Sequence, residues 1–374
     1  MAIVSSSPLD DAVEDATGNP AEGFETLLDR AYKLRYDPAM PPPSEELSLL
    51  IDEYPIGAAG NLTVVQGKSK AGKSAFLSAV LGAVLGGTDD TFCMKWVAGL
   101  KGAIIHLDTE QSLGDWHALV GRGLTRSGLL EAPDRLVSFP LIAFSRSERR
   151  ELLRQVLAKE IEQHDCIAVV IIDGIADLCA SPNDEAEALQ LVSEIHALAQ
   201  EYCCMIVCVL HENPGTDNGK TRGHLGSELN RKAFANLRID KDSDSGISTV
   251  WGTDMRKREI PKREGFCFGW DKAFGMHKYR GRAEGVKAAK REEEKEQKAR
   301  EFFGPIFAAE DSSAPCPGLS VDDVVRIHRG MPGTDETPSF ETVKKRVQRA
   351  EKDGVLRKTQ RGRWVLVPSG TNGT

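Results

Sequence analysis

The chain has 374 residues, of which 40% are apolar, and its formal net charge is −8. This length exceeds a single small core, so it predicts one large domain together with one small domain. The acidic balance argues against a protein that coats nucleic acid with its whole surface, although it leaves room for a local basic patch.

The N-terminus and the cysteines indicate the expected compartment. The N-terminus lacks a basic n-region and an apolar h-region, and no uncharged apolar stretch reaches about 18 residues, so we expect neither secretion nor a membrane span. The eight cysteines form no C-x-x-C pair, and several lie in apolar runs where Cys acts as a small hydrophobe. We therefore expect reduced thiols and a cytoplasmic protein.

In chain order, residues 1–21 are acidic and rich in Ser, Pro and Gly, which predicts a disordered tail. A short helix over 24–36 and the extended run PAMPPPSEE should lead into the main domain, which we place over 22–282. Four continuous apolar runs predict strands buried on both faces of a parallel sheet. They are LTVVQ (62–66), AIIHL (103–107), IAVVII (167–172) and MIVCVL (205–210).

Helical segments separate these runs. The stretch over 184–202 places Leu191, Ile195, Leu198 and Tyr202 on one stripe, which is typical of a helix packed on a sheet. This alternation predicts an α/β doubly wound domain. After Asn236, the segments NLRID, ISTVWGTDM and GFCFGWD predict shorter antiparallel strands that extend the sheet edge.

The C-terminal part has a different pattern. Residues 283–301 are charged and free of proline, which predicts a solvated linker helix. Residues 302–368 read as helix, helix, strand, basic turn and strand, the order of a small winged helix-turn-helix domain, and residues 369–374 as a tail.

The segment GKSKAGKS fits the Walker A pattern and lies between a predicted strand and a predicted helix, the context that a P-loop requires. Its backbone N–H groups and the helix N-terminus would hold the phosphates of ATP. Lys73 would reach the β and γ phosphates, and Ser74 would give a hydroxyl to Mg²⁺. The predicted nucleotide-binding residues are Gly67, Lys68, Ser69, Lys70, Ala71, Gly72, Lys73, Ser74 and Ala75.

Three polar residues end the neighbouring strands. Asp173 follows IAVVII and fits the Walker B carboxylate that holds Mg²⁺. Glu110, in HLDTEQS, is our predicted catalytic base for the attacking water. Two alternatives are that Asp108 is the base instead, or that Glu110 is an acidic residue at a helix N-terminus without a catalytic role. His211, after MIVCVL, would sense the γ phosphate, unless it is a structural histidine.

These motifs together resemble the RecA-like ATPases, in particular the hexameric DnaB and plasmid RepA helicase branch, which includes RepA-like ATPases of mobile elements. The resemblance covers about residues 40 to 280 and includes VVIIDG and VLHENPGTDNGKTRGHLGSEL. It implies a RecA-like fold, with Glu110 at the catalytic glutamate and His211 at the position that couples the nucleotide to DNA loops. Only one helix is predicted before the P-loop, unlike in DnaB, so we do not expect primase recruitment by that route.

The resemblance also implies two elements of a hexameric ring. Its channel loop would fall at residues 212–224, where Lys220, Arg222 and His224 could grip single-stranded DNA, although a plain surface or subunit-packing loop stays possible. Its basic finger, which enters the neighbouring subunit's site, would come from TDMRKRE. We expect a strand here, whose alternation makes Arg256 and Arg258 point together while Lys257 points away, and such a finger can be worth ~10³ or more in rate. A solvated basic turn is the alternative.

Basic residues concentrate near the C-terminus. The segment from Phe340 to Arg363 has nine basic and three acidic residues, so its net charge is +6. The rest of the chain therefore carries −8 − 6 = −14. In the helix there, Val343, Val347 and Ala350 form an inner stripe, and the opposite face could enter a DNA groove with a salt slope of roughly −4 to −5. Protein contacts are the alternative. The predicted DNA-contacting residues here are Lys345, Arg349, Lys352, Arg361 and Arg363.

The sequence thus favours an oligomeric ATPase that uses ATP and Mg²⁺ and acts on DNA, as a RepA-like helicase or a replication or mobilisation ATPase. Two alternatives stay open. One is an ATP-dependent, site-specific DNA-binding regulator, and the other is a RecA-like signalling or defence ATPase that does not unwind DNA.

Overall fold

The computed structural model describes residues 27–40, 46–87, 90–212, 223–309, 318–331 and 338–368. By its internal contacts the chain divides into two units, Met1–Glu45 and Glu46–Thr374. In the first unit, helix α1 (Leu27–Lys33) falls within the helix predicted over 24–36, whose first three residues lie outside the described part.

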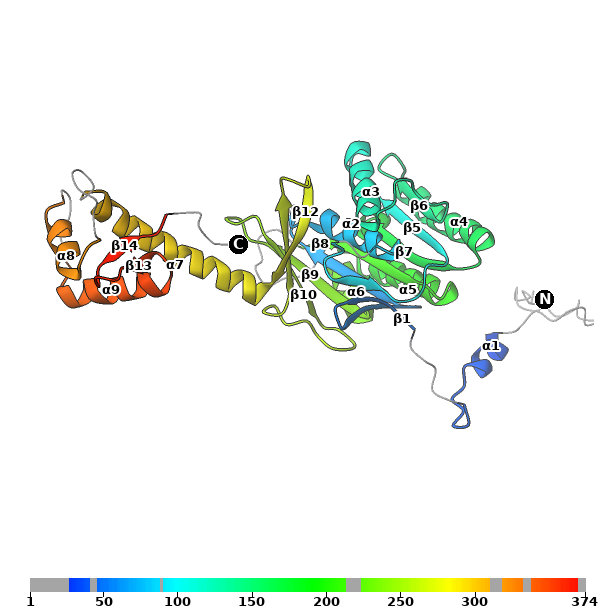
Figure 1. Ribbon diagram of the computed structural model, residues 1–374. Coiled ribbons are helices and arrows are strands. Elements are labelled where there is room, and N and C mark those ends of the chain that lie inside the picture. Colours follow the sequence, from blue (N-terminus) through cyan, green and yellow to red (C-terminus); the bar gives the residue numbers. More distant parts are fainter. Residues whose placement is uncertain are drawn as a thin grey trace, which may run out of the picture. The chain divides into compact units, whose positions relative to one another are not determined.

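A nine-stranded sheet forms the frame of the second unit, in the order β12-β11-β10-β9-β3-β8-β7-β5-β6 (Figure 1). The four predicted runs are its parallel centre. They are β3 (Leu62–Gly67), β5 (Ala103–Asp108), β7 (Ile167–Asp173) and β8 (Met205–His211). The prediction of an α/β fold with a mostly parallel sheet is therefore confirmed.

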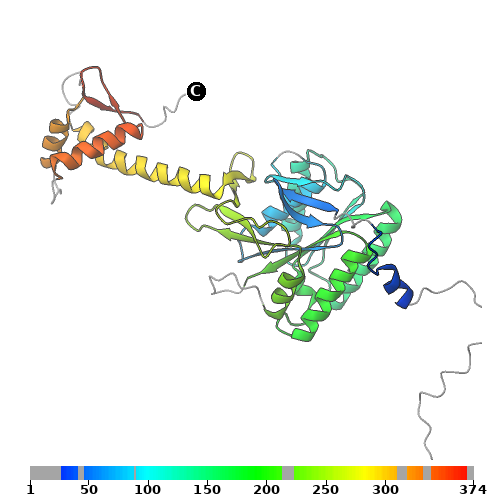
Figure 2. The same cartoon turned by 90° about the horizontal axis from the view of Figure 1, so that it is seen from below.

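Helices cover both faces of the sheet, which explains why its strands are apolar without alternation. One core joins Phe76 and Leu119 to Ile104, and the other joins Leu153 and Leu191 to the next residue along the same strand, Ile105. The first face is covered by α2 (Lys73–Val84) and α3 (Leu113–Ser127), and the second by α4 (Arg146–His164), α5 (Glu185–Glu201) and α6 (Gly223–Lys232). Figure 2 shows α5 and α6 (green) along the second face.

The stripe predicted for the helix over 184–202 is the packed side of α5. Leu191, Ile195 and Leu198 are buried and Tyr202 is half-buried. The helix begins after Asp184, whose carboxylate accepts a hydrogen bond from the backbone N–H of Glu187 at 2.8 Å, the usual N-cap contact.

The outer strands correct one expectation. NLRID lies in β9 (Ala235–Lys241), which pairs with β3 in parallel rather than antiparallel, because α6 carries the chain back across the sheet after β8. Antiparallel pairing starts only with β10 (Ser248–Thr253) and continues through β11 (Phe266–Asp271) and β12 (Met276–Arg282).

Some strands were not predicted. The strand β6 (Leu136–Pro140) pairs in parallel with β5 at the other edge of the sheet. A small separate sheet of β2 (Tyr54–Ala58), β1 (Leu47–Ile51) and β4 (Met94–Trp96) packs its apolar residues into the same core as α2.

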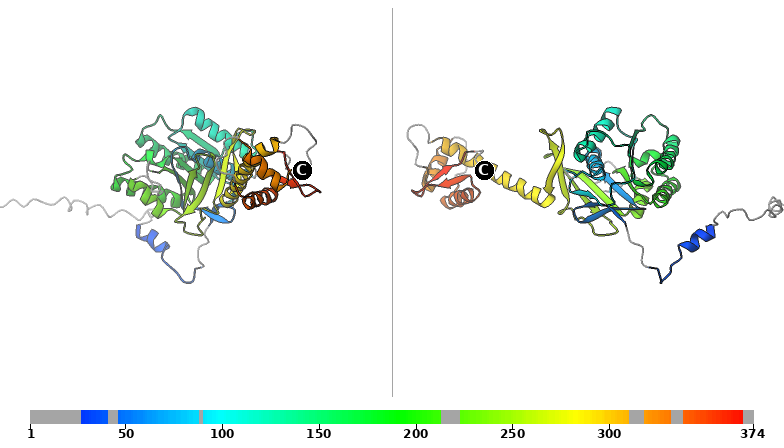
Figure 3. Two further views of the ribbon diagram at one scale, coloured as in Figure 1. Left: turned by 90° about the vertical axis from the view of Figure 1, so that its left-hand side faces the viewer. Right: turned by 45° about the vertical axis from the view of Figure 1, so that its right-hand side comes forward.

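The C-terminal elements have a core of their own. Phe303, Ile306, Val324, Val343 and Val347 are buried together. The elements are α7 (Ala283–Ala308), α8 (Val321–Arg329), α9 (Phe340–Lys352), β13 (Leu356–Lys358) and β14 (Trp364–Leu366). Figure 3 shows α7 as one continuous helix, whose last turns give Phe303 and Ile306 to this core. The buried side of α9 is the predicted one, but a winged helix stays a prediction.

Among the described residues, every helix is too short or too polar to cross a lipid bilayer.

Candidate active site

The P-loop joins the end of β3 to the start of α2. Gly72 has φ of 103°, in the left-handed region, directly before α2 begins at Lys73. At Gly67 a Cβ atom would come within 2.5 Å of the Ile239 carbonyl oxygen, so a side chain does not fit beside β9. Both glycines are therefore required by the shape of the loop, as a phosphate cradle needs.

Lys73 is largely buried and makes three polar contacts. Its Nζ donates to the carbonyl oxygens of Gly67 at 3.1 Å and Lys68 at 3.0 Å, and to His211 Nδ1 at 3.0 Å. Burial lowers the pKa of Lys73, while the nearby carboxylates of Glu110 and Asp173 act in the opposite direction. In this structure the lysine turns back onto its own loop.

His211 connects this lysine to Glu110. Its Nε2 lies 2.7 Å from Glu110 Oε2. Because an ammonium group can only donate, His211 Nδ1 must accept from Lys73, so the ring proton sits on Nε2 and is donated to Glu110. The chain Lys73–His211–Glu110 thus joins the ends of β3, β8 and β5 at one edge of the sheet, as predicted for parallel strands.

The geometry favours Glu110 over Asp108 as the base. Asp108 is fully buried, and its carboxylate accepts hydrogen bonds from the backbone N–H groups of Glu110 (3.1 Å) and Gln111 (2.9 Å) and from Gln111 Nε2 (2.8 Å). These three donors occupy Asp108 in shaping the loop between β5 and α3. Glu110, by contrast, is about a third exposed and lines the cavity described below.

Gly174 brings the loops after β5 and β7 close together. A Cβ atom on Gly174 would lie 2.3 Å from Glu110 Oε1. Only a residue without a side chain leaves room for the Glu110 carboxylate in this position, a requirement that the sequence motif VVIIDG did not reveal.

Asp173 lies beside Asp108 on the neighbouring strand, since the two are paired in the register of β5 and β7. Gln111 Nε2 donates to both, at 2.8 Å to Asp108 and 3.1 Å to Asp173. Burial, and then the charges of Asp108 and Glu110, raise the pKa of Asp173 to about 7. Asp173 and Ser74 line the same cavity and offer a carboxylate and a hydroxyl, the hard oxygen donors that Mg²⁺ prefers.

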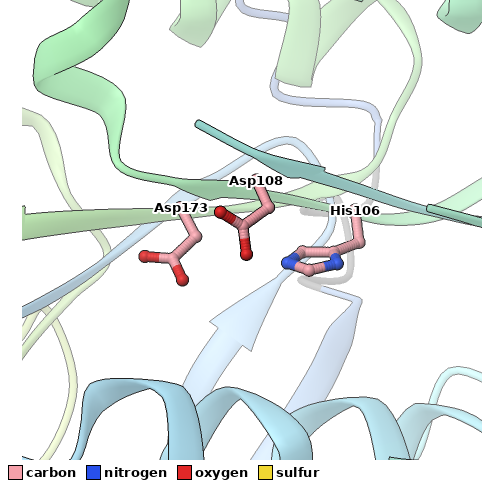
Figure 4. A group of neighbouring side chains, drawn as sticks. All are labelled: His106, Asp108 and Asp173. Atoms are coloured by element: carbon pink, nitrogen blue, oxygen red, sulfur yellow. The ribbon is translucent and has the colours of Figure 1, made fainter. Parts of the chain in front are cut away.

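A second group of possible metal ligands is His106, Asp108 and Asp173, whose ligand atoms lie within 4.8 Å of one another (Figure 4). Trp116 Nε1 donates to Ser138 Oγ at 2.8 Å, and Ser138 Oγ lies 2.9 Å from His106 Nδ1. The serine oxygen can accept a second hydrogen bond or donate its own proton, so this contact is compatible with either neutral tautomer of His106. His106 Nε2 is buried and has no hydrogen-bond partner among the described residues.

The site residues surround a cavity of about 260 Å³. From the predicted set it is lined by Lys70, Gly72, Lys73, Ser74, Ala75, Glu110, Asp173 and His211. Sequence reasoning missed its other lining residues, which are Gln111, Arg122, Lys241, Trp270 and His277. They come from the loop after β5, from α3, from β9 and from the β11–β12 hairpin, and nothing in the sequence gives the approach of that hairpin to the P-loop.

Trp270 is the largest apolar group on the rim of this cavity. Its side chain is 53% exposed, its ring meets His277 edge-on with centroids 5.4 Å apart, and its carbonyl oxygen accepts from Arg280 at 3.1 Å. Burial, and then the charges of Lys241 and Arg122, lower the pKa of His277 to about 4, so the ring beside Trp270 is neutral at pH 7. A fixed, exposed indole of this kind can stack against a planar base.

The two finger arginines do not lie as predicted. The strand β10 ends at Thr253, so strand alternation does not hold for TDMRKRE, and the two side chains separate. Arg256 donates to the carbonyl oxygens of Lys232 (3.0 Å) and Ala233 (3.3 Å) at the end of α6. Arg258 donates to Glu53 at 2.5 Å and lies over the Tyr54 ring at 4.6 Å.

Both arginines lie near the ends of the central strands that are opposite to the P-loop of their own chain. Ser248, at the start of β10, donates to the carbonyl oxygen of Ala71 at 2.8 Å, whereas Thr253, at its end, pairs with Asn236 at the start of β9. The segment after Thr253 therefore cannot serve the cavity of its own chain.

The predicted DNA-contacting residues are dispersed. Lys220 and Arg222 lie outside the described residues, and His224 is exposed in the first turn of α6. Lys345, Arg349, Lys352 and Arg361 are exposed. Arg363 instead donates to the carbonyl oxygen of Gly318 at 3.0 Å and lies 3.6 Å from Asp323, so it belongs partly to the internal contacts of the C-terminal unit.

Comparisons with known proteins bear on the main domain. A family model described as an AAA domain matches residues 38–217. A solved structure, described as the crystal structure of the RadB recombinase, is similar to this chain with 20% sequence identity and a TM-score of 0.41, over 57% of this chain and 88% of that one. No curated protein matches the chain. From the P-loop geometry and the matched family model, we conclude that the chain contains a P-loop ATPase domain with an α/β fold and a mostly parallel sheet.

Proposed function

We propose that this chain is an oligomeric, DNA-dependent ATPase that hydrolyses ATP with Mg²⁺, and that it acts as a RepA-like helicase or replication motor. The observation that carries the hydrolytic part is the chain Lys73–His211–Glu110, which places a carboxylate, an imidazole and an ammonium group at one end of the P-loop cavity.

The residues have distinct tasks in this proposal. The P-loop amides and Lys73 hold the β and γ phosphates, and Lys73 leaves His211 to do so. Glu110 takes the proton of the attacking water, and His211 reports the γ phosphate because it contacts both Lys73 and Glu110. Mg²⁺, when bound by Ser74 and Asp173, would neutralise charge on the phosphate oxygens. Trp270 would support the base of the nucleotide.

Assembly is supported by the position of Arg256. It lies at the opposite edge of the sheet from its own cavity, so it could reach a nucleotide only across a contact between two chains. The competing candidate is Arg122, which lines the cavity of its own chain. Dilution separates the two: a finger from a second chain makes turnover per chain fall with concentration, whereas Arg122 does not.

A mixing experiment tests the shared site directly. Lys73→Ala chains and Arg256→Ala/Arg258→Ala chains are each inactive in the proposal, but a mixture contains some interfaces with an intact P-loop and an intact finger. Recovered ATPase activity in the mixture supports a shared site. Two folded, co-assembling variants that recover no activity would contradict it.

DNA dependence is supported by the exposed cations of α9 and of the β13–β14 turn. The test is ATPase rate with single-stranded DNA, with duplex DNA and without DNA. Stimulation by single strands that is lost in Lys220→Ala/Arg222→Ala supports the motor. Stimulation by one duplex sequence alone would instead support a DNA-binding regulator, the second candidate, which the basic α9 face also fits.

A further inference from the structure

The helix α7 is more than a spacer between two parts of the chain. A helix that only bridges two units in solvent is typically stabilised by pairs of opposite charge at i,i+4. α7 has such a pair in Glu296 and Arg300, 2.9 Å apart, but on another side Lys287, Arg291 and Lys295 follow one another at i,i+4 spacing, and Lys298 comes three residues later. Since like charges at this spacing repel, this row of cations does not itself stabilise the helix.

These four residues, which we call the α7 stripe, share one side of the helix. At 100° per residue, they fall within an arc of about 80°. Glu292, Glu293 and Glu296 lie on the other side, Glu294 and Glu301 border the stripe, and Glu284, one turn before Lys287, falls within its arc. Lys287, Arg291 and Lys298 are exposed, and within the described residues none of them forms an ion pair; Lys295 pairs with Glu292 at 2.6 Å.

The α7 stripe leads into a groove against α9. Lys295 and Lys298 line a cavity of about 610 Å³ together with Arg346 and Arg349 of α9. Two acids, Glu301 and Asp353, also line it, so the groove keeps a net positive charge of 4 − 2 = +2. The floor includes Phe302, but the guanidinium of Arg346 lies over that ring at 4.6 Å, which covers the aromatic face that a base would stack on.

We propose that the α7 stripe, together with Arg346 and Arg349, forms a track for the phosphate backbone of duplex DNA. This inference rests on the proposed DNA dependence and extends the contact surface from α9 to a helix that sequence analysis treated as a linker. From Lys287 to Lys298 the helix rises ~16 Å, a length over which several backbone phosphates of a duplex can be contacted. Contacts of this kind hold DNA without reading its sequence.

The experiment measures affinity of the full chain for a mixed-sequence duplex of about 30 base pairs across a range of salt concentrations. The variant is Lys287→Gln/Arg291→Gln/Lys298→Gln, since glutamine keeps the helix propensity and removes the charge. Three lost phosphate contacts should reduce the salt slope by about 2.7 and weaken binding up to about 500-fold at 0.1 M salt. The matched control is Lys95→Gln/Lys101→Gln/Lys159→Gln, which removes the same charge from exposed positions elsewhere and should change the slope little.

The outcomes separate the two proposals. Equal slopes and affinities for the variant and the control would overturn the track while leaving DNA dependence intact. A wild-type chain that binds no DNA would overturn both. A variant that changes the oligomeric state in size-exclusion chromatography but keeps the wild-type salt slope would overturn the track in favour of a subunit contact. Unchanged ATPase rate without DNA confirms that each variant is folded.

Discussion

The edge of the sheet around the P-loop and the surface of α7 and α9 hold their charges in opposite ways. At the P-loop edge, Lys73, His211 and Glu110 are partly or largely buried and bonded to one another, and Gln111 holds two carboxylates together. On α7 and α9, cations such as Lys298 and Lys345 are exposed. A prearranged set of groups in a low-dielectric site is suited to catalysis. Exposed cations are suited to binding a polyanion, and their attraction weakens as the salt concentration rises.

The largest effect should come from the P-loop edge. Glu110→Gln keeps the size of the side chain and removes the base, so turnover should fall by about 10²- to 10⁴-fold with nucleotide affinity retained. Single-turnover hydrolysis and nucleotide binding measure the two parts. Asp115→Asn, a change of an exposed acid nearby on α3, is the control; unchanged turnover in Glu110→Gln would remove the assignment.

A change of Arg256 tests whether ATP turnover also depends on a side chain that is exposed in the single chain. Arg256→Ala should lower turnover by about 10³-fold in the assembled protein, if its guanidinium serves the neighbouring chain. Arg122→Ala is the matched comparison, since Arg122 lines the cavity of its own chain. A large loss of turnover in Arg122→Ala together with near-normal turnover in Arg256→Ala would show that the catalytic positive charge comes from the same chain as the P-loop.

Gly174 tests how tightly the P-loop edge is arranged. Gly174→Ala puts a methyl group where the Glu110 carboxylate lies, so turnover should fall by about 10²-fold, the typical result of a displacement of about 1 Å. The control is Gly121→Ala in α3, where a Cβ atom meets nothing within 4 Å. Rates that agree between the two variants would show that Glu110 does not depend on this close approach.

Trp270 tests an exposed side chain at the rim of the buried site. Loss of base stacking in Trp270→Ala should weaken nucleotide binding by about 1–3 kcal/mol, with a smaller effect on the maximal rate. Phe274→Ala, a change of an exposed aromatic residue of the same hairpin outside the cavity, should leave the affinity unchanged. A titration with fluorescent ATP gives both values, and equal affinities would exclude stacking on Trp270.

The last prediction concerns the pH dependence of stability, an effect that is close to zero near neutral pH. Burial lowers the pKa of His106 to about 4, below its unfolded value near 6.5, so the folded chain takes up this proton less readily than the unfolded chain. The contribution of His106 to stability is therefore present above pH 6.5 and is lost as pH falls towards 4, by at most about 1.4 kcal/mol per pH unit. Urea unfolding of wild type and His106→Asn at several pH values measures it; parallel pH profiles would contradict the prediction.

The predictions from the sequence succeeded where a local pattern has one physical meaning. Continuous apolar runs require burial on both faces, so they indicated the four central strands, and GKSKAGKS between a strand and a helix indicated the P-loop. Spacing on α5 and α9 indicated the buried sides of those helices. Because parallel strands end at one edge, the meeting of Lys73, Glu110, Asp173 and His211 was also predictable.

Only the tertiary structure decided the remaining features, because each depends on segments far apart in the chain. The β11–β12 hairpin brings Trp270 and His277 to the P-loop cavity, and the end of β10 at Thr253 separates Arg256 from Arg258. The three donors on the Asp108 carboxylate favour Glu110 as the proposed base. Periodicity determines which side of an element is buried, whereas contacts between elements depend on how the chain closes on itself, and no local pattern contains that information.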